Sequence, residues 1–206
     1  MKKIIVTLLF AAGTLYSFAQ AEFSIGLKGG PNFANINTNE TPGANYESRT
    51  GFHLGAFALI KGEKVGFQPE ILFSQQGRKF TYSGSPDLKE NFSYVNIPLI
   101  VKLYTIAGIN LQVGPQIGLL TSAERENFSS GVVTKQDIKN DLKKTDLSLA
   151  LGVGWDLPFG LSIDGRYNWG LTDNENGYNS LGSVGSPSSV KNQVWQFSIG
   201  YKFLKF

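Results

Sequence analysis

The sequence predicts an all-β fold, an eight-stranded antiparallel up-and-down transmembrane β-barrel that follows a cleaved signal peptide. Apolar residues recur at every second position, as in strands, and not with the period of a helix. They do so in segments of about ten residues, the length of a barrel strand that crosses a membrane. Tight turns alternate with long polar connections along the chain. The 206 residues suit one domain, and 24 glycines with 13% aromatic residues favour a β-rich fold.

The first 19 residues are predicted to be a signal peptide, and residues 20–206 the barrel domain. Lys2 and Lys3 give a basic start, residues 4–16 are an apolar run, and small residues precede the expected cleavage after Ala19. The run is shorter than the ~20 residues that a membrane-spanning helix needs. Because the chain contains no cysteine, we expect neither a lipid anchor on cysteine nor a disulfide.

Eight segments show the alternation, and the connections between them follow a pattern. Outer-membrane barrels have long extracellular loops and short periplasmic turns, so both chain ends are predicted to lie in the periplasm. The expected strands are 22–33, 51–60, 65–77, 93–104, 108–121, 145–157, 160–171 and 192–203. Tight turns are expected at 61–64, 106–107 and 158–159, and long connections at 34–50, 78–92, 122–144 and 172–191.

One face of each strand is predicted to meet lipid. A soluble barrel of the lipocalin type would place its apolar residues inside and polar residues outside. Here bulky aliphatic residues share one face while small and charged residues share the other, which favours lipid on the outside. The residues expected to face lipid are Val95, Ile97, Leu99, Val101, Leu111, Leu147, Leu149, Leu151, Phe197 and Ile199.

Aromatic residues near the strand ends are predicted to form two girdles at the membrane interfaces. Trp169 and Trp195 are expected at the extracellular rim, and Trp155, Tyr104, Tyr201 and Phe203 at the periplasmic rim. In the last strand, aromatic and aliphatic residues alternate with polar or small ones up to the terminal Phe206. This ending resembles the signal that the outer-membrane assembly machinery reads.

The inward face is predicted to be a polar plug. An eight-stranded barrel is just wide enough for side chains to fill it, and unpaired charge in that space would be costly. A water-filled pore would have walls of the same residue types, so a narrow porin-like channel remains the alternative. The predicted interior residues are Lys28, His53, Gln68, Glu70, Lys102, Gln112, Gln116, Asp164, Arg166, Asn168 and Lys202.

Three segments resemble the PorT-like outer-membrane β-barrel family: residues 94–102 (YVNIPLIVK), 25–30 (IGLKGG) and 201–203 (YKF). The resemblance implies a small barrel in the outer membrane of a Gram-negative bacterium, and it identifies no catalytic residue. One member of that family takes part in protein secretion, but these residues do not single out that member. Within the first segment, Pro98 is expected to mark a bulge or kink, because proline removes a ladder hydrogen bond.

The function expected from the sequence is a non-enzymatic structural or interaction role in the cell envelope. Without Lys2 and Lys3, 17 basic residues face 16 acidic ones, so nucleic-acid binding is not expected. No cofactor or metal is predicted. Outer-membrane lipid and the assembly machinery are the expected partners, together with an envelope or extracellular protein met by the loops. The exposed loop residues suited to such contacts are Tyr46, Arg49, Phe80, Tyr82, Arg125, Phe128 and Tyr178.

A lipid-modifying enzyme is the third hypothesis. His53 is the only histidine, and such enzymes pair histidine with serine and a carboxylate. Ser48 lies in the preceding connection, while Glu70 and Ser74 lie on the next strand, so their distance to His53 depends on strand register. A histidine that is hydrogen-bonded inside the barrel is the favoured interpretation.

Overall fold

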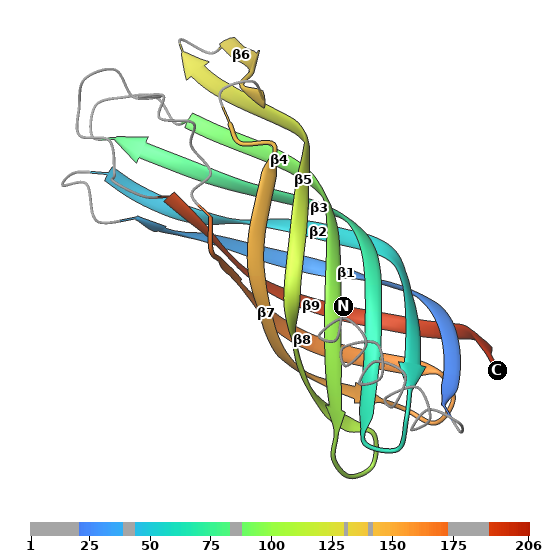
Figure 1. Ribbon diagram of the computed structural model, residues 1–206. Coiled ribbons are helices and arrows are strands. Elements are labelled where there is room, and N and C mark those ends of the chain that lie inside the picture. The colour runs from blue at the N-terminus through green and yellow to red at the C-terminus, as the bar shows by residue number, and fades with distance from the viewer. Residues whose placement is uncertain (1–20, 39–43, 83–87, 130–131, 140–141, 173–189) are drawn as a thin grey trace, which may run out of the picture.

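The computed structural model describes residues 21–38, 44–82, 88–129, 132–139, 142–172 and 190–206. They form a closed antiparallel barrel of eight strands, with a ninth strand beside it (Figure 1). The strands are β1 (Glu22–Thr38), β2 (Ala44–Lys61), β3 (Val65–Tyr82), β4 (Leu88–Tyr104), β5 (Ile109–Ser129), β6 (Val132–Asp137), β7 (Thr145–Asp156), β8 (Leu161–Gly170) and β9 (Val190–Lys205).

Closure follows the order of the chain. Each barrel strand pairs with the next one, β5 pairs with both β4 and β7, and β9 returns to pair with β1. The predicted eight-stranded antiparallel barrel is therefore confirmed. The predicted signal peptide lies outside the described residues. Within the part of the chain that the structure describes, no helix has the length and apolar character needed to cross a membrane.

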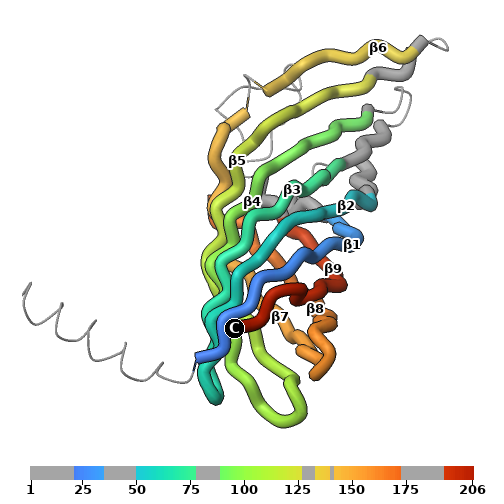
Figure 2. The backbone as a smooth tube through the Cα atoms, turned by 90° about the vertical axis from the view of Figure 1, so that its right-hand side faces the viewer, coloured from blue at the N-terminus to red at the C-terminus, as the bar shows by residue number. Residues whose placement is uncertain are grey.

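The barrel has two different ends. At one end, here called the turn end, the connections are the short segments 62–64, 105–108 and 157–160. The last residue lies there too, because Phe206 and Phe23 exchange two backbone hydrogen bonds of 2.8 and 3.1 Å. At the other end, the loop end, several strands extend well past β7 and β8, as the tube in Figure 2 shows.

Strands at the loop end are longer than predicted, so the expected long connections 34–50 and 78–92 are reduced to 39–43 and 83–87. The expected connection 122–144 is the clearest correction: β5 continues to Ser129 and turns back as β6, with six residue pairs from Glu124–Asp137 to Ser129–Val132. Beyond the membrane a strand needs no apolar face, so the period-two signal fades although the hydrogen-bond ladder continues. Apolar periodicity therefore located only the membrane-crossing part of each strand.

Two of the tight turns use backbone conformations with positive φ. The β4–β5 turn has Ala107 at 54° and Gly108 at 82°, and the β7–β8 turn has Gly160 at 93°. Glycine adopts such conformations without the clash that a Cβ introduces. These turns hold neighbouring strands in register at the turn end.

Replacing Gly160 with alanine is expected to lower the free energy of unfolding by about 1 kcal/mol, because an L-residue is strained in the left-handed region. Its Cβ would also lie 3.0 Å from the carbonyl oxygen of Lys202. Urea titration of the protein in lipid vesicles measures this loss. Gly165→Ala is the control, since φ there is not positive and the added Cβ would meet only the Phe197 ring, 3.4 Å away. Equal losses in the two variants would contradict the prediction.

The strand register is regular at Pro98. Pro98 pairs with Gln116 on β5, and the pairs on either side of it keep the same register with β3 and with β5. The expected bulge at Pro98 is therefore wrong. The irregularity between β4 and β5 lies between Ser93 and Tyr94 instead. The sheet accommodates proline by omitting a ladder hydrogen bond, with no extra residue inserted.

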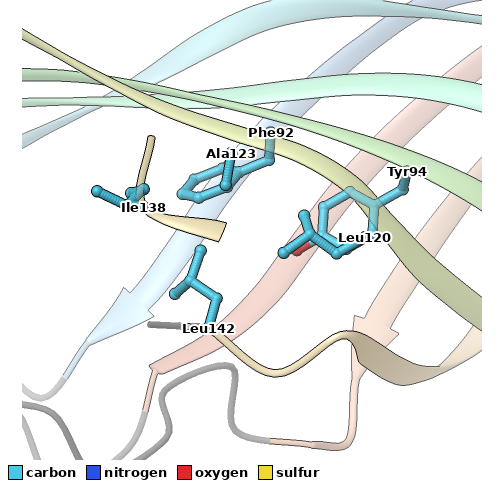
Figure 3. Close-up of a cluster of buried hydrophobic side chains, with 6 residues drawn as sticks. All are labelled: Phe92, Tyr94, Leu120, Ala123, Ile138 and Leu142. Carbon is cyan, nitrogen blue, oxygen red and sulfur yellow. The ribbon is translucent and has the colours of Figure 1, made fainter. Parts of the chain in front are cut away.

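An apolar cluster lies on the inner face of β4 and β5 at the loop end (Figure 3). Ile138 and Leu142, from the connection that follows β6, pack against it, and Ile138 donates a backbone hydrogen bond of 3.0 Å to Ala123. Burial of these side chains attaches the connection to the barrel wall. The members are Phe92, Tyr94, Leu120, Ala123, Ile138 and Leu142.

Candidate functional site

The centre of the barrel is crossed by a bidentate ion pair. Arg166 on β8 donates two hydrogen bonds, of 2.8 and 2.6 Å, to the two carboxylate oxygens of Glu70 on β3. In the closed ring β3 and β8 are four strands apart in either direction, so this pair joins opposite walls. Both side chains are almost fully buried. Bidentate arginine–carboxylate pairs are among the strongest hydrogen-bonded contacts in proteins.

Lys28 and Asp164 complete this central cluster. Lys28 Nζ donates to both oxygens of Asp164, at 2.9 and 3.1 Å, and lies 3.6 Å from Glu70. Arg166 Nε lies 3.2 Å from Asp164 and donates at 2.6 Å to Gln112 Oε1. Two cations thus share two carboxylates, and the cluster has no net charge. Burial of charges is tolerated only with such pairing.

A second charged group lies nearer the turn end and is centred on Asp156. Lys102 on β4 and Lys202 on β9 donate to its two oxygens at 3.1 and 2.9 Å. Tyr104 donates to the same carboxylate at 2.8 Å. Strands β4 and β9 are also four positions apart in the ring, so Asp156 links opposite walls at this level.

Tyr104 corrects one prediction about the girdles. It was expected at the periplasmic rim, but its ring is buried inside the barrel and its hydroxyl bonds Asp156. The alternation of residues 93–104 places Tyr104 on the same face as Lys102, so it has to point inward. Proximity to a strand end indicates an interface position only for an outward-facing residue.

Uncharged residues lie next to the central cluster on its loop side. His53 is buried, and its Nδ1 and Nε2 lie 2.9 Å from Asn32 Oδ1 and from Ser198 Oγ. Ser74 accepts a 2.9 Å hydrogen bond from Asn32. Of the residues weighed for a lipid-modifying site, Glu70 is engaged by Arg166, and the Ser48 side chain lies outside the described part. His53 therefore takes part in a hydrogen-bonded interior network.

The remaining predicted interior residues, Gln68, Gln116 and Asn168, are also buried. A void of about 10 Å³ adjoins Gln116 and Asn168, which is room for about one water molecule. Buried oxygens of Gln68, Asn168 and Gln196 have no hydrogen-bond partner within the described part of the chain. Among the described residues, no group of three or more histidine, cysteine or acidic side chains could hold a metal ion.

The outer face is apolar over a band of regular height. Outward-facing side chains stay apolar or small from residue 52 to 60 on β2, nine positions, and from 109 to 119 on β5, eleven positions. A tilted strand needs 9 to 11 residues to span the hydrocarbon core. The ten residues predicted to face lipid all lie on this outer face, either exposed or half-buried: Val95, Ile97, Leu99, Val101, Leu111, Leu147, Leu149, Leu151, Phe197 and Ile199.

The other predicted girdle residues point outward. Trp169 and Trp195 lie toward the loop end, and Trp155, Tyr201 and Phe203 toward the turn end; all five are about half exposed. Trp155 donates a 3.0 Å hydrogen bond to the carbonyl oxygen of Ala107 in the β4–β5 turn. Trp195 contacts the ring of Tyr167 on the neighbouring strand, with centroids 4.9 Å apart.

The interior prediction missed Asp156, Asn32 and Ser198. Asp156 lies two and four residues after Gly154 and Gly152 and therefore on the inner face of β7, so the alternation would have identified it. Because Asp156 lies at the end of the expected strand, it was not included in the predicted interior.

Among the loop residues proposed for contacts, Arg125 is half-buried and forms an ion pair of 2.7 Å with Glu90. Tyr178 lies outside the described residues, as do the side chains of Tyr46, Arg49, Phe80, Tyr82 and Phe128.

Comparison with known proteins gives a family match. Residues 18–176 match the profile of the outer membrane protein β-barrel domain, and no curated protein matches significantly. Similar solved structures include Neisserial surface protein A, with 12% identity, 88% of this chain and 97% of that chain covered, and a TM-score of 0.48. The attachment invasion locus protein of Yersinia pestis has 17% identity and a TM-score of 0.46, with 89% of this chain and 99% of that chain covered. Outer membrane protein W of E. coli has 14% identity and a TM-score of 0.39, with 87% of this chain and 97% of that chain covered.

Proposed function

This chain belongs to the outer membrane protein β-barrel domain family and lies in the outer membrane, and on that premise we propose that it has a structural or interaction role, with a barrel interior closed by polar side chains. In this proposal the loop end is extracellular, and the turn end, with both termini, faces the periplasm. The short turns at one end and the strands that extend past the apolar band at the other support that orientation. Residues 1–19 would direct export as a cleaved signal peptide.

The observation that carries the closed interior is the pair of links between opposite walls. Arg166 and Glu70 join β8 to β3, and Asp156 joins Lys102 on β4 to Lys202 on β9. An ion moving along the axis would have to displace both groups, and each displaced charge would be left without its partner in a confined space. The same charges would line the conducting path in the channel alternative.

The loop end is the proposed site of partner contacts. Lipid covers the outer wall and mainly polar side chains fill the lumen, so the loop-end segments are the part open to an extracellular protein. The β5–β6 hairpin supports this role, because Val133 and Lys135 on β6 are exposed.

The C-terminal strand β9 is proposed to be the segment that the assembly machinery recognises, through its alternating aromatic residues. We also propose that the barrel is PorT-like, on the resemblance of residues 94–102, 25–30 and 201–203.

A non-enzymatic role without cofactor is part of the proposal. His53 would be the general base of a lipid-modifying site, and its contacts with Ser198 Oγ and Asn32 Oδ1 are of the kind that such a base makes. These three residues are buried inside the barrel, however, whereas acyl chains of the membrane meet the outer face. In this proposal, His53 supports the barrel interior.

Single-channel recording of the refolded mature protein in a planar bilayer tests the closed interior. We expect a silent bilayer after insertion has been verified by protease protection of the vesicle-embedded barrel. Stable, ion-selective steps would overturn the proposal, and they would indicate that Lys28, Lys102, Arg166 and Lys202 line a pore. As a positive control for the recording, a large porin in the same bilayer should give open steps.

A further inference from the structure

A polar hollow of about 290 Å³ lies on the outer wall toward the loop end. The side chains that line it come from β2, β3, β4 and β5 and mostly face outward: Thr50, Gln75, Asn91, Ser93, Ser122 and Glu124. It is distinct from the two charged groups of the barrel interior, and it shares one lining residue, Phe92, with the apolar cluster of Figure 3. The interior plug and the loop contacts do not account for this feature.

The hollow lies just beyond the apolar band of the outer face. On β2, Thr50 is the next outward-facing residue beyond Phe52 in the direction of the loop end. On β3, Gln75 is the next one beyond Phe73. Ser93 comes after Val95 on β4, and Gln75, Ser93 and Ser122 form one row across paired strands. Outside the hydrocarbon core comes the interfacial zone of lipid headgroups. The hollow therefore opens into the layer that holds the polar parts of outer-leaflet lipids.

Two irregularities of the sheet border the hollow. The register between β2 and β3 shifts between Ser48 and His53, and the register between β4 and β5 shifts between Ser93 and Tyr94. A bulge bends its strand and redirects side chains, and bulges are frequent next to binding and active sites. The bends that such irregularities introduce therefore shape the wall on both sides of the hollow.

The lining has the chemistry of a saccharide site. It offers hydroxyl groups from Thr50, Ser93 and Ser122, amides from Gln75 and Asn91, and the carboxylate of Glu124. These groups donate to and accept from sugar hydroxyls. Among the lining residues that the structure describes, none is cationic, so the lining favours neutral sugars over phosphate groups.

We propose that this hollow binds the saccharide part of an outer-leaflet glycolipid. The inference rests on the placement of the loop end in the outer leaflet, but not on a closed interior. Lys135 on β6 lies 4.0 Å from Glu124 and 3.4 Å from Glu126, so it partly offsets the negative charge at the rim. Bound sugar would hold one glycolipid molecule against β2–β5.

The test uses the full-length mature protein refolded into phosphatidylcholine vesicles that contain purified lipopolysaccharide with its core sugars. Glycolipid retained by each barrel after mild extraction is measured by native mass spectrometry. Substituting leucine for both Ser93 and Ser122 fills the hollow and removes two hydroxyls. We expect this double variant to retain glycolipid about tenfold less well, which corresponds to about 1.4 kcal/mol. Free core oligosaccharide should displace the glycolipid from the wild-type protein, and inorganic phosphate should not.

Thr145→Leu is the matched control, since Thr145 is an exposed outward residue at the loop end of β7 that does not line the hollow. It should retain glycolipid as the wild type does. The heat-dependent shift of folded barrels in gel electrophoresis verifies folding of each variant. Equal retention by the double variant, displacement by phosphate alone, or no retention by the wild type would overturn the inference. A conductance result would leave it intact, so the two proposals can fail separately.

Discussion

Substituting glutamine for Glu70 is expected to lower the free energy of unfolding by about 3 to 5 kcal/mol, the cost of leaving a buried charge without its partner. Glu70 accepts both hydrogen bonds of Arg166 and lies 3.6 Å from Lys28. Without its carboxylate, two cations share the single charge of Asp164 in a site closed to bulk water. Urea titration in lipid vesicles, followed by tryptophan fluorescence, measures the loss.

The double variant Glu70→Gln/Lys28→Met separates charge balance from packing. It leaves Arg166 and Asp164 as a neutral pair, so its loss should be smaller than the sum of the two single losses by about 1 kcal/mol or more. Lys135→Gln is the control, because Lys135 forms exposed ion pairs with Glu124 and Glu126; it should change stability by less than about 1 kcal/mol. Additive losses in the double variant would show that the four charges do not act as one group.

Arginine at Leu99 is expected to prevent most of the protein from folding into membranes. Leu99 lies on the outer face of β4, midway along the apolar stretch from Val95 to Leu103. A charged side chain at mid-bilayer depth costs about 2 to 4 kcal/mol in a barrel of this kind. The folded fraction after refolding into vesicles, read from the heat-dependent gel shift, measures the effect, and Leu149→Arg on β7 should behave alike.

Gln193→Arg provides the comparison. Gln193 points outward on β9 but lies beyond Trp195 at the loop end, in the interfacial layer where arginine is tolerated. It should fold like the wild-type protein. Normal folding with arginine at both Leu99 and Leu149 would refute the assignment of the outer face to lipid.

Much of the barrel could be predicted because a membrane imposes strict rules on a strand. One face has to be apolar for about ten residues, and every backbone group has to be paired, which requires a closed sheet. Residues 95–103 satisfy the first rule without exception on their outer face, so the sequence predicts this strand clearly. The hairpin of β5 and β6 lies beyond those rules. Its residues 124–137 follow no apolar alternation, so the sequence predicts a loop there.

The sequence by itself determined the eight membrane-crossing segments and which face of each is apolar, because strand alternation is a local property of the chain. It also determined that Lys28, Glu70, Asp164 and Arg166 point inward. Only the tertiary structure decided which of them meet, since the contact of Arg166 with Glu70 depends on barrel closure, shear and register over 96 residues of sequence. The same holds for the hollow bordered by two bulges, because a bulge arises from the pairing of two strands and has no signature in either strand alone.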